Sequence, residues 1–368
     1  MLAASAAKPV QSNTASAVAR VMVCDDSVVI RSAVARMLES DPQVCVVARV
    51  ANGEQALAEL SRQPVDVVVL DIEMPVMDGL TALPLLLRAD PTLRIIMAST
   101  LTTRGADIAL RALHLGAADY LPKPSSAAIQ NDSFRRALLA KVRGLARLRQ
   151  VAISKPATTA ATCPPAMALR PLSRQRPNLL AIGSSTGGPQ ALFTFVQALG
   201  PKLPVPVVLT QHMPKTFTPI LADHLNKLGA MPCAEATHGE KLEAGHLYLA
   251  PGDQHLCVDA GAGGLRARLT ADPPENFCRP SVDPMLRSAN AACGGRVLIV
   301  MLTGMGHDGL AGTREIIRDG GGALAQDEAS SVVWGMPGAI AQAGLCHAIL
   351  PLNRLAAKVR EILEIKTT

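Results

Sequence analysis

The sequence predicts an α/β protein that contains two doubly wound parallel sheets. Across residues 20–140, short apolar runs typical of buried strands alternate with amphipathic stretches typical of helices. Similar apolar runs, again followed by helix-compatible stretches, resume after residue 178. Between the two regions lie the end of a helix and a basic segment rich in proline, alanine and threonine. The chain therefore divides into a tail (1–19), a first domain (20–140), a linker (141–177) and a second domain (178–368).

Composition limits the class of protein. The 368 residues are 49% hydrophobic and only 2% aromatic, so the cores must be aliphatic. The eight cysteines are scattered without any Cys-x-x-Cys pair, and we expect reduced thiols, a cytoplasmic location and no zinc site. The alanine- and serine-rich tail lacks the apolar segment of a secretory signal, and we interpret it as disordered. No apolar run approaches the length of a membrane span, so direct membrane insertion is not expected.

The net charge of +6 is concentrated in one segment. Between Ser133 and Asn178 the chain has ten lysines and arginines and no acidic residue, which more than accounts for the excess. Residues 133–153 read as an amphipathic helix whose basic face is solvated. No helix-turn-helix signature or zinc-finger spacing follows, so we expect no nucleic-acid partner.

Charged and polar side chains follow the predicted strands of the first domain. These strands are 21–24, 44–47, 65–70, 94–98 and 119–121. Because the carboxyl ends of parallel strands meet at one edge of a sheet, the residues that follow them should converge there: Asp25, Asp26, Asp71, Ser99 and Lys123. Three crowded carboxylates repel one another unless a cation neutralises them, and an all-oxygen cluster suits Mg²⁺. Each residue alone reads as a solvated cap at a strand end, but the five together favour a binding site.

The motifs around these residues resemble the receiver domain of two-component response regulators. They are Cys24-Asp25-Asp26-Ser27, Leu70-Asp71-Ile72-Glu73-Met74-Pro75-Val76-Met77-Asp78-Gly79 and Lys123-Pro124. The resemblance implies a flavodoxin-like fold in which Asp71 accepts a phosphoryl group from a histidine kinase. It also implies that Asp25, Asp26 and Asp71 hold Mg²⁺, and that Lys123 contacts the phosphoryl oxygens. Ser99 is the implied switch hydroxyl, with Thr100 as the alternative one residue on, and Tyr120 is the implied aromatic switch.

The second domain begins with a strand that leads into a serine-containing turn. Leu179-Leu180-Ala181-Ile182 is followed by Gly183-Ser184-Ser185-Thr186-Gly187, which fits the Gly-x-Ser-x-Gly pattern. In that pattern a tight turn lifts a serine hydroxyl above the sheet and leaves backbone N–H groups for an oxyanion. Ser185 is therefore the candidate nucleophile. For the motif alone, the alternative is a small-residue turn that binds phosphate at a helix N-terminus.

Two later strands supply the partners that a nucleophilic serine needs. His212 follows the strand at 205–210, where a general base is expected. Asp308 follows the strand at 296–302, in a glycine-rich loop from which it can orient the histidine. Taken singly, both residues are also explained as caps at the ends of elements. The order serine, histidine, aspartate differs from that of the α/β-hydrolases, so we predict a triad on a different, Rossmann-like sheet.

These motifs resemble the catalytic domain of the chemotaxis protein-glutamate methylesterases, the CheB family. Thr210-Gln211-His212-Met213-Pro214, Leu302-Thr303-Gly304-Met305-Gly306-His307-Asp308-Gly309 and Trp334-Gly335-Met336-Pro337 add to the serine turn, and with the receiver the likeness covers nearly the whole chain. It implies a cytoplasmic enzyme that hydrolyses glutamyl methyl esters on methyl-accepting chemotaxis receptors, releases methanol and deamidates some glutamines. Thr186 and Met305 resemble the residues that flank the nucleophile and the oxyanion site, and no metal is implied in this domain. The family also implies that the receiver blocks the active site until Asp71 is phosphorylated.

Two other functions fit parts of the sequence. A nucleotide-binding module would use Gly183–Gly188 as a phosphate cradle, although the Gly-x-Gly-x-x-Gly fingerprint is absent. A receiver-controlled DNA-binding regulator would need a basic recognition helix in the second domain, which is instead close to neutral. Replacing Ser185 by alanine separates the esterase from both, because only the esterase needs the hydroxyl.

Overall fold

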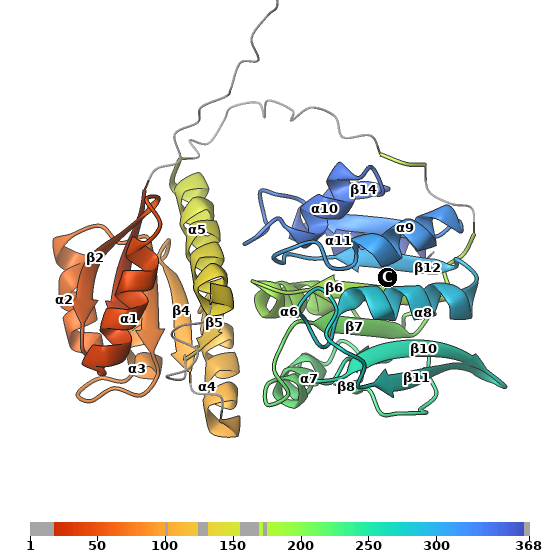
Figure 1. The fold of residues 1–368 in the computed structure, drawn as a ribbon, viewed down its shortest axis with the longest axis horizontal. Coiled ribbons are helices and arrows are strands. Elements are labelled where there is room, and N and C mark those ends of the chain that lie inside the picture. Colours follow the sequence, from red (N-terminus) through yellow and green to blue (C-terminus); the bar gives the residue numbers. More distant parts are fainter. Residues whose placement is uncertain (1–17, 100–101, 124–131, 155–168, 172–174, 364–368) are drawn as a thin grey trace, which may run out of the picture.

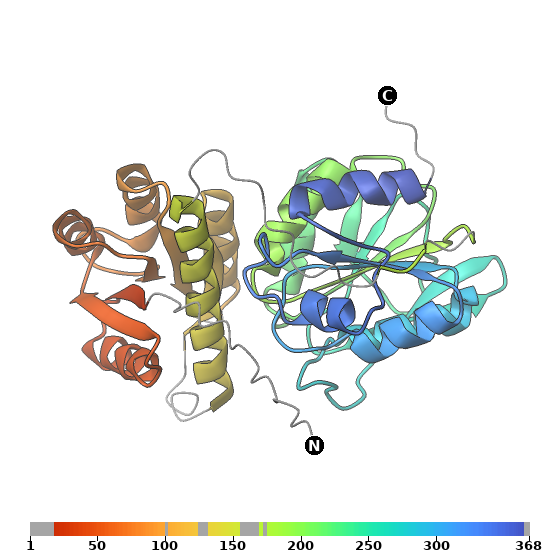
Figure 2. The same cartoon turned by 90° about the horizontal axis from the view of Figure 1, so that it is seen from above.

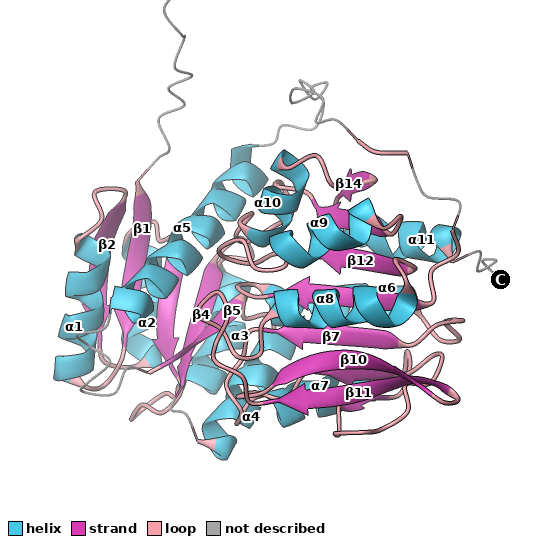
Figure 3. Ribbon diagram, turned by 45° about the vertical axis from the view of Figure 1, so that its right-hand side comes forward, coloured by secondary structure: helices cyan, strands magenta, loops and turns pink. Residues whose placement is uncertain are grey.

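The computed structural model describes residues 18–99, 102–123, 132–154, 169–171 and 175–363. Most of the tail predicted to be disordered, the middle of the predicted linker and Thr100 lie outside these residues. The described chain forms two parallel sheets, each covered by helices (Figure 1, Figure 3). The α/β class predicted from the alternating apolar runs is confirmed. Within the described ranges, no helix combines the length and the apolar character needed to cross a bilayer.

The N-terminal domain is a five-stranded parallel sheet in the order β2-β1-β3-β4-β5. Its strands begin and end within three residues of the predicted ones, because the apolar runs mark where each strand is buried. The elements are β1 (Ala19–Cys24), α1 (Val28–Glu39), β2 (Val44–Val50), α2 (Gly53–Arg62), β3 (Val67–Asp71), α3 (Gly79–Ala89), β4 (Arg94–Ser99), α4 (Thr103–His114), β5 (Asp119–Pro122) and α5 (Asp132–Ser154).

Helix α5 stands between the two domains (Figure 2). The predicted amphipathic helix is confirmed, but the expectation that its basic face is solvated is wrong for two residues. Lys141 is only 9% exposed and lies 2.5 Å from the Asp119 carboxylate. Arg149 is 6% exposed and forms ion pairs with Asp66 and with Asp90, the latter at 2.6 Å. The buried carboxylates of Asp66 and Asp119 and the partly exposed one of Asp90 therefore hold this helix through its basic side chains.

The C-terminal domain is a seven-stranded parallel sheet in the order β14-β13-β12-β6-β7-β9-β8. A separate antiparallel hairpin, β10-β11, was not predicted. The elements are β6 (Leu179–Ser184), α6 (Gly188–Leu199), β7 (Val207–Gln211), α7 (Thr218–Lys227), β8 (Cys233–Glu235), β9 (Leu247–Leu249), β10 (His255–Gly261), β11 (Gly264–Thr270), α8 (Val282–Cys293), β12 (Val297–Met301), α9 (Leu310–Arg318), β13 (Gly322–Gln326), α10 (Met336–Gln342), β14 (Ala348–Leu350) and α11 (Leu352–Ile362).

The central strand of this sheet, β6, is buried on both faces. Leu180 and Ile182 pack into one hydrophobic cluster, and Leu179 and Ala181 pack into another on the opposite face. The chain runs from β6 to β7 on one side and later returns to β12 on the other side. The strand order therefore reverses at β6, and ligands of such sheets bind outside the carboxyl ends of the strands at this point.

The two domains meet where α5 packs against the loop between β13 and α10. A Cβ atom at Gly144 would lie 2.0 Å from the carbonyl oxygen of Val332, so only glycine permits this close approach. The Arg147 guanidinium donates hydrogen bonds of 2.9 Å to the carbonyls of Glu328 and Ser331. Helix α5 thus belongs to the core of the first domain and also supports the second.

Candidate active site

The turn after β6 is fixed by hydrogen bonds from three directions. The Ser185 N–H donates to the Thr303 carbonyl at 3.0 Å, and the Gly188 N–H donates to the Ser185 carbonyl at 2.8 Å. The Ser184 hydroxyl donates to the Gln211 side chain at 2.7 Å, and the Gln211 amide donates to the Ser185 carbonyl at 3.0 Å. A Cβ atom at Gly188 would lie 2.0 Å from the Gln211 oxygen, so a side chain there would break this arrangement. Ser185 is therefore held at the carboxyl edge of the sheet.

The predicted base and acid lie together at the same edge. His212 follows β7, Asp308 follows β12, and the His212 Nε2 atom lies 2.7 Å from the Asp308 carboxylate. The Asp308 side chain is buried, at 2% exposure, and that of His212 is nearly so, at 11%. Ser185 and His212 line one cavity of about 350 Å³, and the predicted residues Thr186 and Met305 line it too. The fold thus gathers residues that lie more than a hundred positions apart in the sequence.

Asp308 accepts an unusually complete set of hydrogen bonds. Besides His212, its donors are the Asn276 amide (2.8 Å), the Ser281 hydroxyl (2.8 Å) and the N–H groups of Val282 (2.6 Å) and Asp283 (3.1 Å). The last two N–H groups begin α8, so the carboxylate also caps a helix N-terminus. Burial alone raises the pKa of Asp308, but the hydrogen bonds and the His212 charge outweigh it and hold the pKa well below its usual value. Asp308 is therefore a permanent anion that can orient the imidazole.

The second ring nitrogen of His212 faces a cysteine. Its Nδ1 atom lies 3.4 Å from the Cys278 sulfur, whose residue is partly exposed. Burial lowers the pKa of His212, whereas the hydrogen bond to Asp308 and the Cys278 sulfur raise it. Since Nε2 is bound to Asp308, Nδ1 of the neutral ring is the nitrogen that remains to accept a proton.

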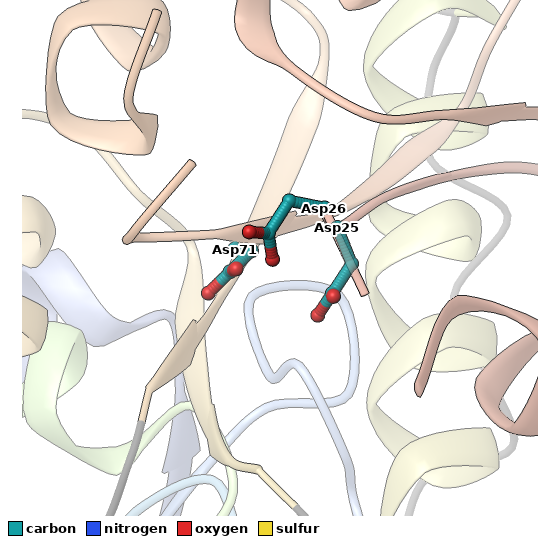
Figure 4. A group of neighbouring side chains, drawn as sticks. All are labelled: Asp25, Asp26 and Asp71. Carbon is teal, nitrogen blue, oxygen red and sulfur yellow. The ribbon is translucent and has the colours of Figure 1, made fainter. Parts of the chain in front are cut away.

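The first domain carries an acidic cluster at the corresponding edge of its own sheet (Figure 4). Oxygens of Asp25, Asp26 and Asp71 all lie within 4.8 Å of one another, as the sequence predicts. Asp25 and Asp71 are buried, whereas Asp26 is exposed. The donor set consists only of carboxylate oxygens and has an open side, which fits a hard cation such as Mg²⁺ that keeps several waters.

Lys123 completes this cluster. Its ammonium lies 2.7 Å from Asp71 and 3.2 Å from Asp25. Burial raises the pKa of Asp71 to about 6, despite the hydrogen bond from Lys123 that opposes it. Ser99 is buried at the end of β4, and its carbonyl accepts the Lys123 N–H at 2.6 Å, while Thr100 lies outside the described residues. Ser99 therefore adjoins the cluster through its backbone.

Residues of the first domain form one wall of the catalytic cavity. Six of them line it together with Ser185 and His212: Tyr120, Leu121, Pro122, Phe134, Ala137 and Lys141. The Asp119 carboxylate, which is 1% exposed, accepts the Gly187 N–H at 3.0 Å. Since Gly187 stands two residues after Ser185, at the start of α6, a carboxylate of the first domain contacts the turn that holds Ser185.

Tyr120, the predicted aromatic switch, lies at this interface. Its ring stacks on Phe217 of the C-terminal domain, with centroids 4.7 Å apart, and both rings are buried. Burial raises the pKa of the Tyr120 hydroxyl, with a further contribution from Asp119. Because Tyr120 follows Asp119 and precedes Lys123 by only three residues, the same short segment contacts the acidic cluster and the catalytic domain.

Comparison with known proteins shows which family the chain belongs to. Residues 180–359 match the family described as CheB methylesterase, and residues 21–131 match the response regulator receiver domain. The chain is 52% identical to the protein-glutamate methylesterase/protein-glutamine glutaminase of group 2 operon of Rhodospirillum centenum, over 93% of both chains. The chain belongs to the CheB family. It is also 51% identical to the protein-glutamate methylesterase/protein-glutamine glutaminase of Azospirillum brasilense, over 93% of this chain and 92% of that protein. Among solved structures, the CheB methylesterase catalytic domain of Thermotoga maritima is 35% identical, with a TM-score of 0.49 over 52% of this chain and 99% of that chain.

Several residues of this CheB site were missed by the sequence reasoning. Gln211 adjoins His212 but braces the serine turn, and Asn276 and Cys278 reach Asp308 and His212 from an irregular segment. Ser281 has the sequence of a helix N-cap, yet its hydroxyl donates to Asp308 instead. The only signal available for these residues was polarity in segments without periodicity, which does not distinguish a site from a loop.

Proposed function

We propose that this chain hydrolyses glutamyl methyl esters on methyl-accepting chemotaxis receptors and deamidates receptor glutamines, with Ser185 as the nucleophile. The observation that carries the proposal is the His212–Asp308 pair, 2.7 Å apart, in the cavity that Ser185 also lines. Family membership supports the ester hydrolase chemistry, and the relatives' names include both activities.

The chemistry follows from the atoms that are present. The Ser185 oxygen attacks the ester carbonyl, and His212 Nδ1 takes the hydroxyl proton in place of its weak contact with the Cys278 thiol. Asp308 stabilises the imidazolium that forms. The imidazolium then gives its proton to the departing methoxide, and water hydrolyses the acyl-enzyme by the same proton transfers in reverse.

The oxyanion of this reaction needs donors close to the serine. We assign this role to backbone N–H groups of the turn before α6, where the helix N-terminus adds a favourable partial charge. We assign Thr186 and Met305, which line the cavity, to the walls that hold the ester beside these donors. The Gly187 N–H, now bonded to Asp119, becomes available only when that carboxylate withdraws.

Phosphorylation of Asp71 is the proposed trigger for that withdrawal. Asp25, Asp26 and Asp71 would hold Mg²⁺, which when bound neutralises the carboxylates and the incoming phosphoryl group. Lys123 would then exchange its carboxylate partners for phosphoryl oxygens, with Ser99 as the switch hydroxyl. A shift of the Tyr120 segment would remove Asp119 and Lys141 from the catalytic domain, which is a population shift from a closed to an open arrangement.

This function defines the partners and the location that we propose. The phosphodonor is a chemotaxis histidine kinase, the substrates are the cytoplasmic helices of the receptors, and the enzyme works in the cytoplasm. The proposed catalytic steps use side chains and backbone groups of the C-terminal domain. Nucleotide or DNA binding by this domain remains the rival function that the test must separate.

The test is methanol release from membranes that contain methylated receptors. With Mg²⁺ and a small phosphodonor, we expect wild type to release methanol and Ser185→Ala to be slower by about 10⁶-fold. Without the phosphodonor, wild type should be slower but above the variant. A nucleotide- or DNA-binding protein would give no release from either, and its binding would survive Ser185→Ala.

A further inference from the structure

Residues 275–278 form a tight turn beside the triad. The Glu275 N–H donates to the Cys278 carbonyl at 3.1 Å, and the Cys278 N–H donates back to Glu275 at 2.9 Å. The two central residues, Asn276 and Phe277, have φ angles of +52° and +62°. L side chains rarely adopt this left-handed backbone, and phenylalanine gains nothing there from a local hydrogen bond.

Phe277 at the apex is 98% exposed. The chain has only five phenylalanines, and the other four, Phe134, Phe193, Phe195 and Phe217, are buried or half-buried. An aromatic ring in water on an unfavourable backbone contributes nothing to folding that glycine or asparagine would not supply better. A single exposed apolar side chain is ordinary, but this ring lies on a left-handed backbone in a turn bonded to Asp308 and His212, which points to a contact made with another molecule.

The turn is tied to the reacting residues on both sides of Phe277. The Asn276 amide donates to Asp308 at 2.8 Å, and the Cys278 sulfur lies 3.4 Å from His212 Nδ1. Glu275 is anchored by two bonds to the Arg287 guanidinium, of 2.7 and 2.6 Å. The exposed ring is therefore carried on a braced support, and preorganisation of this kind reduces the entropy lost on binding.

We propose that Phe277 is the docking residue that the enzyme inserts between apolar side chains of the receptor helix bearing the ester. The proposal rests on the proposed function and names a contact for it. An α-helix with its side chains is about 10–12 Å across, whereas successive Cα atoms lie only about 3.8 Å apart. Because Cys278 contacts His212, a helix that presents an ester at His212 also reaches Phe277, the residue before Cys278. The ring is exposed even while the first domain lines the catalytic cavity, so it is available to the receptor in that arrangement too.

The test compares Phe277→Gly and Phe277→Leu with wild type, with Leu169→Ala as the matched control. Leu169 is also exposed, at 56%, and its neighbour Arg170 bonds the backbone of Cys346, just before the edge strand β14. Each protein is assayed with Mg²⁺ and phosphodonor for methanol release from methylated receptor membranes and for hydrolysis of p-nitrophenyl acetate, and its thermal melting is recorded.

We expect Phe277→Gly to raise KM for receptor membranes about 10- to 100-fold, the range for a truncated aromatic hot spot. Hydrolysis of p-nitrophenyl acetate should stay within about twofold, because the triad is untouched, and melting should be unchanged or higher because glycine accepts the left-handed backbone. Phe277→Leu should retain most of the receptor affinity, and Leu169→Ala should match wild type in both assays.

An unchanged KM in Phe277→Gly would overturn the proposal. An equal loss on p-nitrophenyl acetate would also overturn it, because Phe277 would then act on the triad rather than on the receptor. So would a change in oligomeric state on sedimentation, which would assign the ring to a contact between copies of the chain. If wild type releases no methanol at all, the proposed function fails instead.

Discussion

The acidic cluster and the proposed triad each lie at the carboxyl edge of a parallel sheet, yet their carboxylates have opposite surroundings. Asp308 has five hydrogen-bond donors and caps a helix, so its negative charge is fully stabilised without any ligand. Asp71 has Lys123 and two carboxylate neighbours, and burial raises its pKa to about 6. The protein itself stabilises the negative charge of Asp308, whereas the charge of Asp71 depends on the groups that bind beside it.

The difference reflects the different requirements of the two proposed sites. A triad aspartate must hold one orientation throughout the reaction, so the fold supplies every partner from the chain itself. A phosphoryl acceptor must change state, so its neighbours leave room for a cation and an incoming group. The contact between Asp119 and Gly187 joins the two sites, because a carboxylate of the first domain accepts a hydrogen bond from the turn that holds Ser185 in the second domain.

The largest effect should come from disturbing the complete site. Asp308→Asn keeps the shape of the side chain but places an NH₂ group against hydrogen-bond donors that now bond to a carboxylate oxygen. His212 therefore loses the anion that orients it. We expect kcat for methyl ester hydrolysis to fall by about 10⁴-fold. The matched control is Asp253→Asn, which removes a carboxylate that is 69% exposed and paired only with Arg279 among the ion pairs of the described chain. A loss of less than about tenfold in Asp308→Asn would remove this residue from the triad.

A smaller effect should follow from a substitution that separates the two domains by a steric clash. Gly144→Ala places a methyl group 2.0 Å from the Val332 carbonyl, so α5 and the catalytic domain must move apart. Overpacking of this kind costs about 1–3 kcal/mol, which predicts roughly a tenfold or greater rise in the activity of the unphosphorylated enzyme. Alanine also favours the helix itself, so the melting temperature of the first domain should not fall. Unchanged basal activity would show that this contact does not hold the closed arrangement.

The smallest effect should be a pH dependence of the closed arrangement. His224 of α7 packs against His114 of α4, with ring centroids 4.9 Å apart. Burial lowers the pKa of His224, and the charges of His114 and Lys227 add to this, while Asp107 and Asp223 oppose it. Arg111 is the further charged group that lines the adjoining cavity.

We expect opening to return His224 toward its ordinary pKa, because His114 of the first domain then moves away, so the closed arrangement binds the proton less well than the open one. Its stability is therefore complete above the ordinary histidine pKa of about 6.5 and declines as the pH falls below it. We expect the ratio of unphosphorylated to phosphorylated activity to rise about two- to fivefold between pH 7.5 and 5.5. His224→Gln, which cannot take up the proton, should give a flat ratio, and an equally steep ratio in the variant would assign the effect elsewhere.

The sequence was sufficient for both strand-end sites because parallel strands bring their ends together wherever they lie in the chain. Asp25 and Asp71, or His212 and Asp308, could be matched once the apolar runs before them were recognised as strands. The likeness of the motifs to known families then supplied roles that spacing alone left open.

The remaining features depend on tertiary contacts that have no local pattern. Asn276 reaches Asp308 from a segment without periodicity, so nothing in its neighbourhood marks it. Lys141 and Arg149 were expected to be solvated because their acidic partners lie in another part of the chain. The sequence of either domain alone also does not predict which surfaces of the two domains meet. Gly144 shows why, because glycine is needed there only to allow the close approach of Val332 from the other domain.

The most direct test of the account is the reactivity of Ser185 toward a small sulfonyl fluoride. The rate of labelling reports whether the cavity shared by Ser185 and the first domain is open, and it needs no receptor. We predict faster labelling of wild type when Mg²⁺ and phosphodonor are both present, and no increase after removal of Mg²⁺ or in Asp71→Asn. An unchanged rate in wild type whose Asp71 is demonstrably phosphorylated would contradict the claim that phosphorylation uncovers the active site.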